Sequence, residues 1–211
     1  MTGSALVEQD PQTGKYQLGY HAFELGCVVL ERWPVRPVAG HYMQKITERT
    51  GESLYLGMRC ANELLLVEST EGFGNYQLAS PLGGRMPLYG CSQGKILLAY
   101  MPKKQRAEFF KTVTLKSYTP YTITDPEQLE QELEQIRAQG YAVESGELQI
   151  GLKSVAAPVF DPDGQCEYAI SAVTIARSGM AGDNFQKLQE VVIRTAEEIT
   201  CELRHPSAHG R

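Results

Sequence analysis

The chain has 211 residues, of which 42% are hydrophobic and 21% are charged, a composition typical of a folded domain with a substantial core. Its formal net charge of −5 argues against nucleic-acid binding by these residues alone, because phosphate contacts need clustered lysine and arginine. No apolar run is long enough to cross a bilayer, and the N-terminus lacks a signal-peptide pattern, so we expect a cytoplasmic protein without a membrane partner.

Cysteine and histidine spacing predicts neither disulfides nor a metal site. The five cysteines, at positions 27, 60, 91, 166 and 201, are odd in number and include no Cys-x-x-Cys pair, which favours reduced thiols packed as small apolar groups. His205 and His209 are four residues apart, but Pro206 lies between them and disfavours a helix that presents both rings. We therefore expect no metal ion and no cofactor.

The first predicted elements are a β-hairpin and two helices. Short alternating runs on either side of a Pro-Gln-Thr-Gly turn predict the hairpin within residues 5–19. Apolar spacing predicts a helix over 21–33 and a second one over 37–50, and each is followed by a proline or a glycine. An isolated hairpin buries too little surface to be stable in water, which raises the question of what it packs against.

The middle of the chain mixes strand and helix signals. Alternating apolar residues, with glycine-rich segments between them, predict strands over 53–58, 64–67 and about 76–79. Helical spacing predicts a helix over 92–101 and a short one that begins at Pro102. Residues 111–124, rich in threonine and tyrosine, show no periodicity and are expected to form a loop.

The C-terminal part begins with a helix over 126–139, capped by Asp125 and ended by Gly140. Strands over 152–160 and 167–175 follow, and a final helix runs from Asn184 to about Arg204. Helices and antiparallel strand pairs in this order predict an α+β domain, with a curved antiparallel sheet flanked by helices.

The last hairpin predicts which side chains share one face of the sheet. A two-residue turn that pairs Asp161 with Gly164 would fix the register of both strands. The facing pairs on one side are then Ser154 with Ser171, Ala156 with Ala169, and Leu152 with Val173. The other side carries an apolar set, Val155, Ala157, Val159, Ile170 and Ala172.

Two opposed hydroxyls among small residues are unusual in a protein core. Small side chains leave space, and hydroxyls offer hydrogen bonds to whatever occupies it, so this face predicts a ligand pocket. The alternative is that an overlying helix fills the space and that both serines bond to the backbone.

The segment PLGGRMPLYGCSQGKILLAY supplies a second candidate part of a binding site. A phosphate-binding loop would need a glycine where Tyr89 stands and a serine or threonine where Ile96 stands, so that motif is absent. The simpler prediction is a loop that leads into a helix, whose first free N–H groups, near Ser92 and Gln93, favour a carboxylate or a phosphate.

Two alternatives compete with ligand binding. In an enzyme, Cys91 or Ser92 would be the nucleophile at this helix start, where a thiol's pKa would fall, but none of the four histidines is placed to act as its base. Glu144 and Glu147 resemble paired catalytic carboxylates, although we expect them to be solvated loop residues. In a pure interaction module, side chains would fill the pocket and the fold would serve dimerisation.

The stretches GRMPLYGCSQGKILLAYMP and GYAVESGELQIGLKSVAAPVFDPDGQCEYAIS resemble the two signature regions of the IclR family of bacterial transcriptional regulators. TGKYQLG, with the following helix that contains HAFELG, resembles the joint between the two parts of those proteins. The resemblance covers nearly the whole chain, in the family's order and spacing. It implies a ligand-responsive transcriptional regulator with a GAF-like effector-binding domain, and no enzymatic activity.

The resemblance also implies a division of the chain. Residues 1–19 correspond to the remnant wing hairpin of a winged helix-turn-helix, 20–35 to a linker helix, 36–205 to the effector-binding domain and 206–211 to a flexible tail. DNA would be contacted through an upstream domain that is missing from this chain. The chain is then a fragment or a truncated gene product, as the orphaned hairpin suggests, or a stand-alone sensor. Family members form dimers and tetramers, so we expect self-association.

The effector site implied by the resemblance combines backbone and side-chain groups: the N–H groups of Ser92 and Gln93, the side chains of Glu144, Ser154, Ser171 and Val173, and an apolar wall at Leu78. Three positions differ from members that bind small oxo-acids, since Glu144 replaces an aspartate, Ser154 a cysteine and Val173 a serine. The lost hydroxyl makes one corner apolar. We therefore expect a carboxylate effector larger or less oxygenated than glyoxylate or pyruvate, such as an aromatic or branched acid.

Overall fold

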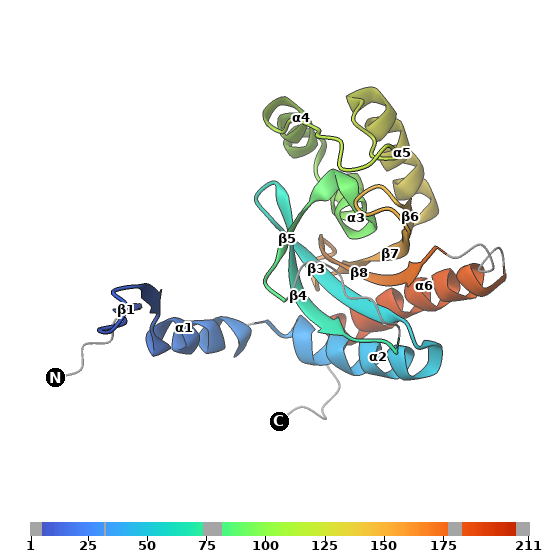
Figure 1. Cartoon of the computed structure of the whole chain (residues 1–211). Helices are drawn as coiled ribbons and strands as arrows, with labels where there is room; N and C mark the ends of the chain where they lie inside the picture. The colour runs from blue at the N-terminus through green and yellow to red at the C-terminus, as the bar shows by residue number, and fades with distance from the viewer. Residues whose placement is uncertain (1–5, 32, 74–81, 177–182, 206–211) are drawn as a thin grey trace. The chain divides into compact units, whose positions relative to one another are not determined.

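The computed structural model of the chain describes residues 6–31, 33–73, 82–176 and 183–205. These residues belong to two compact units, residues 1–36 and residues 37–211 (Figure 1). The strand expected over 76–79, the wall residue Leu78 and the tail 206–211 lie outside the described residues.

The first unit contains the expected hairpin and helix. Strand β1 (Val7–Gln9) pairs antiparallel with β2 (Tyr16–Leu18), which confirms that a hairpin precedes the helices. Asp10 begins the turn, because its carboxylate accepts hydrogen bonds from the N–H of Gln12 at 2.8 Å and from the hydroxyl of Thr13 at 2.6 Å. Helix α1 (Tyr20–Glu31) follows and has no buried residue.

The second unit is built on a six-stranded antiparallel sheet with the order β5-β4-β3-β8-β7-β6. Its strands are β3 (Ser53–Cys60), β4 (Glu63–Thr70), β5 (Arg85–Pro87), β6 (Ala142–Ser145), β7 (Leu152–Phe160) and β8 (Cys166–Ile175). Its helices are α2 (Val35–Thr50), α3 (Ser92–Tyr100), α4 (Lys103–Thr112), α5 (Pro126–Gln139) and α6 (Asp183–Arg204), and a single 3-10 turn, η1 (Leu88–Gly90), precedes α3. The α+β prediction is confirmed, although the short strands β5 and β6 were not predicted.

Helices cover both faces of the sheet (Figure 1). Helices α2 and α6 lie on one face, and α3 and α5 lie on the other. The amphipathic helix α6 buries Leu188, Val192, Ala196 and Ile199 and contacts β7 and β8. The predicted apolar face of those strands is fully buried, with Val155, Ala157, Val159, Ile170 and Ala172 each at most 1% exposed.

The predicted register of the last hairpin is wrong by two residues. Ser154 pairs with Val173 instead of Ser171, and Ala156 pairs with Ser171. One residue of the difference arises in the turn, where the N–H of Asp161 donates to the carbonyl of Gln165 at 2.9 Å, and the other arises from a bulge between Val159 and Phe160. Because the two shifts add to an even number, each side chain remains on the face that was predicted for it.

Candidate functional site

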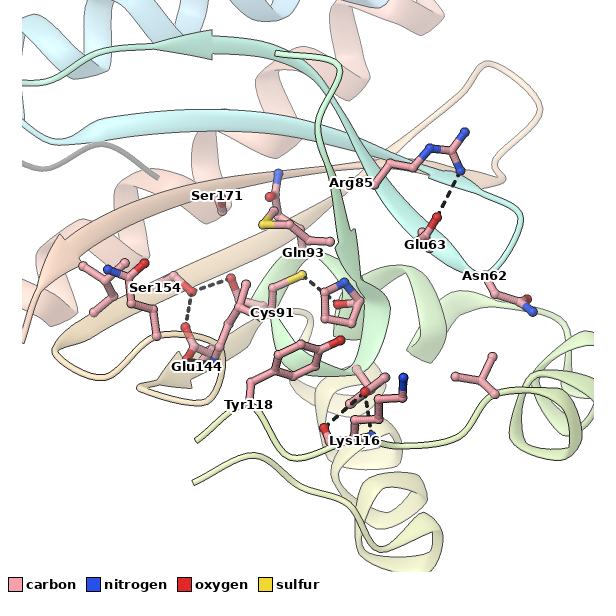
Figure 2. A pocket seen from close by; sticks show the side chains of 18 of the residues that line it. Asn62, Glu63, Arg85, Cys91, Gln93, Lys116, Tyr118, Glu144, Ser154 and Ser171 are labelled. Carbon is pink, nitrogen blue, oxygen red and sulfur yellow. Dashed lines mark hydrogen bonds and ion pairs between the residues drawn. The ribbon is translucent and has the colours of Figure 1, made fainter. Parts of the chain in front are cut away.

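A cavity of about 700 Å³ lies between the N-terminal end of α3 and the sheet (Figure 2). Six of the seven residues that the family resemblance assigns to effector binding line it, namely Ser92, Gln93, Glu144, Ser154, Ser171 and Val173. They come from α3, β6, β7 and β8, so the fold brings together positions that are up to 81 residues apart, from Ser92 to Val173. The overlying helix does not fill the space above the serines, contrary to the alternative considered from the sequence.

The start of α3, which lines this cavity, carries backbone donors that no carbonyl of the helix can satisfy. The first hydrogen bond of the helix runs from the N–H of Lys95 to the carbonyl of Cys91 at 3.0 Å. The N–H groups of Ser92 and Gln93 precede it and have no acceptor within the helix. Gly94 permits the first turn of α3 to lie close to η1, because a Cβ at this position would lie 2.1 Å from the carbonyl oxygen of Leu88.

Two serines and a glutamate form a hydrogen-bonded chain at the deep end. The hydroxyls of Ser92 and Ser154 are 2.8 Å apart, and the Ser154 hydroxyl donates to Oε2 of Glu144 at 3.1 Å (Figure 2). Oε1 of Glu144 accepts from the backbone N–H of Glu147 and, at 3.4 Å, from that of Leu148. Burial raises the pKa of Glu144, and these hydrogen bonds oppose the rise without cancelling it.

Glu144 and Glu147 are not the solvated loop residues that we expected. Glu144 lies on β6, directly opposite Ser154 on β7, and is 5% exposed. Glu147 is 8% exposed and its Oε1 accepts from Lys95 Nζ at 2.5 Å. The fully buried Lys95 also donates to Glu132 of α5 at 2.9 Å, so one ammonium joins α3, α5 and the segment that connects β6 to β7. Burial raises the pKa of Glu147 although Lys95 acts in the opposite direction.

Gln93 and Ser171 contribute polar groups on the sheet side of the cavity. Nε2 of Gln93 donates to the carbonyl oxygens of Tyr55 at 3.0 Å and Ala169 at 2.9 Å. The Ser171 side chain is 1% exposed, and within the described ranges its hydroxyl has no hydrogen-bond partner. Val173 is 4% exposed and lies opposite Ser154, so it forms an apolar corner of the deep end.

The outer end of the cavity was not predicted from the sequence. It is lined partly by residues 112–118, a segment without periodicity that Tyr89 holds in place. The Tyr89 hydroxyl accepts from the backbone N–H of Lys116 at 2.8 Å and donates to its carbonyl at 3.2 Å. Arg85 also lines this end and is paired with Glu63 at 3.1 Å. Only the richness in tyrosine and threonine marked this segment, and composition alone does not locate a lining residue.

Cys91 lacks the properties of a nucleophile. The thiol is 8% exposed and donates to the carbonyl of Pro87 at 3.4 Å. Burial raises its pKa to about 12, opposite to the fall expected at a helix start, because desolvation of a thiolate outweighs the field of the helix. Within the described part of the chain, no group of three or more His, Cys, Asp or Glu residues could hold a metal ion. None of the helices described has the length and hydrophobicity that a membrane crossing requires.

The sequence matches known transcriptional regulators over most of its length. The family described as "Bacterial transcriptional regulator IclR C-terminal" matches residues 27–201. The chain is 31% identical over 203 residues to the HTH-type transcriptional repressor AllR of Klebsiella pneumoniae, a match that covers 96% of this chain and 74% of that protein. It is 32% identical over 198 residues to AllR of Salmonella typhimurium, with coverage of 94% and 72%.

Solved structures agree with the sequence matches. The IclR protein of Thermotoga maritima superposes with a TM-score of 0.82 at 34% identity, covering 95% of this chain and 80% of that chain. The C-terminal domain of the Escherichia coli regulator KdgR gives 0.72 at 26% identity, with coverage of 81% and 99%. The PobR inducer-binding domain from Acinetobacter, solved as a double mutant with 3-hydroxy benzoic acid, shares the fold, with a TM-score of 0.70 at 23% identity and coverage of 78% and 96%. The chain therefore belongs to the IclR family of bacterial transcriptional regulators and is a regulator, not an enzyme.

Proposed function

We propose that the cavity between α3 and the sheet binds a small organic carboxylate, and that this acid is the effector through which transcription is controlled. One observation carries the proposal. Ser171 is 1% exposed, its side chain lines a cavity of about 700 Å³, and its hydroxyl has no hydrogen-bond partner among the residues described. Because the side chain faces the cavity, an apolar occupant would leave this hydroxyl without a partner at a cost of about 1–3 kcal/mol, so the site favours an occupant that bonds to it.

The polarity of the deep end supports an anion. The N–H groups of Ser92 and Gln93 lie in the first turn of α3, where the helix dipole places partial positive charge. Glu144 does not oppose an anion strongly, because three donors already occupy its oxygens. A carboxylate between these N–H groups and the Ser171 hydroxyl would satisfy all three donors.

The size and lining of the cavity support an acid with an apolar body. Binding sites for drug-sized ligands have volumes of roughly 300–1,000 Å³, and this cavity lies well within that range. Leu152, Val173, Val113 and Met86 all line it. An aromatic or branched acid would cover these side chains, whereas glyoxylate or pyruvate would leave most of the cavity to water.

Binding of acids to the purified chain tests the proposal. Benzoate, phenylacetate and isovalerate should raise its melting temperature and bind in calorimetry, and phenylacetamide, which lacks the charge, should bind more weakly. Ser171→Ala should weaken binding of the acids, and Ser145→Ala, on an exposed serine of β6 outside the cavity, should not. Stabilisation only by cationic or uncharged compounds would contradict the proposal.

We also propose that the regulator contacts DNA through a domain outside this chain and that the chain forms dimers or tetramers. Helix α1 supports self-association, because Phe23 is 73% exposed, Leu25 and Val28 are each 48% exposed, and no residue of the helix is buried. Phe23→Asp should shift native mass spectra towards the monomer, whereas Ile150→Asp, at a residue of the second unit that is 65% exposed, should not. A wild-type chain that is monomeric in these spectra would contradict self-association.

A further inference from the structure

The side-chain amide of Gln93 is held in one orientation. Its Nε2 uses both protons on backbone carbonyls, those of Tyr55 in β3 and Ala169 in β8. If the amide were turned over, Oε1 would face the same two carbonyl oxygens, and acceptors would oppose acceptors. The side chain is 2% exposed and lines the cavity, and no donor among the described residues contacts Oε1. Gln93 therefore offers an occupant an acceptor whose position is fixed.

The Ser92 hydroxyl also acts as an acceptor. Ser154 has a single hydroxyl proton, and it donates that proton to Oε2 of Glu144. The contact of 2.8 Å between Ser92 and Ser154 must then use the proton of Ser92. Ser92 keeps lone pairs for an occupant of the cavity but no proton.

Donors and acceptors are therefore mixed at the deep end of the cavity. The donors are the N–H groups of Ser92 and Gln93 and the hydroxyl of Ser171, and the acceptors are Gln93 Oε1 and Ser92 Oγ. A carboxylate without further polar groups satisfies the donors and leaves both acceptors without a proton. Such a mismatch in a buried site is costly, because each acceptor has lost water and gained nothing in return.

We infer that the deep end selects carboxylic acids that carry a hydroxyl or N–H group beside the carboxylate, and that Gln93 Oε1 is the atom that recognises this donor. The inference rests on the proposed function, since it concerns the same cavity and the same class of ligand. It goes further by naming a second functional group on the effector and the residue that determines specificity for it.

Matched pairs of acids test the inference in calorimetry on the purified chain. Mandelate compared with phenylacetate, and hydroxyisovalerate compared with isovalerate, differ only in one hydroxyl next to the carboxylate. We expect the hydroxylated member of each pair to bind about tenfold more tightly to the wild type, the effect of one well-formed hydrogen bond. Equal affinities within both pairs would overturn the inference while leaving the proposed function intact.

Two variants distinguish the contribution of the acceptor Gln93 Oε1 from that of the donors at the deep end. Gln93→Met keeps the length of the side chain but removes Oε1, so the affinity ratio within each pair should fall to about one. Ser171→Ala is the matched control, because it removes a donor and should weaken both members of a pair while the ratio stays near tenfold. A ratio that is unchanged in a folded Gln93→Met protein would overturn the role of Gln93.

A third variant leaves Gln93 in place, so the test does not depend on the folding of Gln93→Met. In Glu144→Gln, the new amide would donate to Ser154, Ser154 would donate to Ser92, and the proton of Ser92 would face the cavity. The preference for hydroxylated acids should then decrease relative to the wild type, and an unchanged or larger preference would overturn the proton order argued for Ser92. If neither member of any pair binds the wild type, the proposed function fails and the inference fails with it.

Discussion

The two faces of the six-stranded sheet are built on different principles, although alternate residues of the same strands form them. Ile170 of β8 is fully buried on the face covered by α6, and its neighbour Ser171 faces the cavity beneath α3. The α6 face is an apolar interface. The cavity face is held by buried polar contacts, among them the bonds from Gln93 to two strand carbonyls and the pairing of Lys95 with Glu147.

One strand therefore serves two functions: one of its faces stabilises the fold, and the other keeps a cavity open. An apolar interface gains free energy in proportion to the area removed from water and tolerates little empty volume. A cavity for a ligand has to remain open, so its walls need a framework that does not collapse into the space. Directional hydrogen bonds and ion pairs provide one, because they fix positions without filling volume.

The largest expected effect comes from breaking the polar framework at its most buried charge. Lys95→Met should destabilise the protein by about 3–5 kcal/mol, because it leaves Glu147 and Glu132 without their buried cation. Unfolding in urea measures the loss, with Lys104→Met on an exposed lysine of α4 as the control. A loss below about 1 kcal/mol would mean that apolar packing, not the ion pairs, holds α3 over the cavity.

The apolar face should respond strongly to a cavity-forming substitution. Ile170→Ala removes a fully buried side chain that lies between β3 and β7, and should cost about 2–5 kcal/mol in the free energy of unfolding. The affinity of the folded variant for carboxylic acids should be unchanged, because the residue faces away from the cavity. Chemical denaturation and calorimetry at one protein concentration provide both values, and a specific loss of acid binding would contradict the separation of the two faces.

Glu144 should make the free energy of unfolding depend on pH. Burial raises the pKa of its carboxyl above the ordinary value of 4.5, so the folded state binds this proton more tightly than the unfolded state. The wild type should therefore lose stability as the pH rises from 4.5 through the raised folded pKa, at up to about 1.4 kcal/mol per pH unit. Glu144→Gln cannot titrate, so its stability relative to the wild type should increase over this interval.

Denaturation midpoints of both proteins, measured at steps of pH, test this expectation. Glu147 also has a pKa raised by burial and titrates in the same direction, but it is present in both proteins and its contribution largely cancels in the difference. A stability difference that stays constant with pH would indicate that Glu144 titrates alike in the folded and unfolded states.

The smallest expected effect on stability is that of Ser171→Ala. The hydroxyl has no partner within the described residues, so its removal leaves no broken bond and should change the unfolding free energy by less than about 0.5 kcal/mol, or stabilise the protein slightly. Its effect on the affinity for acids should be much larger. If this variant loses as much stability as Ile170→Ala, the hydroxyl is part of the folded framework instead of the binding surface.

Local signals in the sequence were sufficient for most of the elements. Asp125 caps α5 as predicted, because its carboxylate accepts from the N–H of Gln128 at 2.7 Å, and Gly140 ends the helix with a φ of +83°. The alternation of side chains along β7 and β8 placed Ser154 and Ser171 on the correct face. These features depend on neighbours only a few residues away, and a single sequence displays them directly.

Features that depend on distant contacts were missed. The buried Glu147 pairs with Lys95, 52 residues earlier, and nothing near Glu147 in the sequence indicates that partner. The residues at the outer end of the cavity belong to a segment that Tyr89 holds, and this contact also follows from the fold and not from local pattern. Strand β5 has only three residues, too few to show an alternation.

The hairpin of β7 and β8 constrains changes in the length of this protein. Its longer turn and its bulge each displace the pairing by one residue, and only together do they keep Ser171 towards α3 and Ile170 towards α6. A deletion of one residue in the turn therefore requires a compensating change of one residue at the bulge. Without it, the Ser171 hydroxyl would face the apolar interface with α6. Insertions and deletions in this hairpin should accordingly occur in compensating pairs among related sequences.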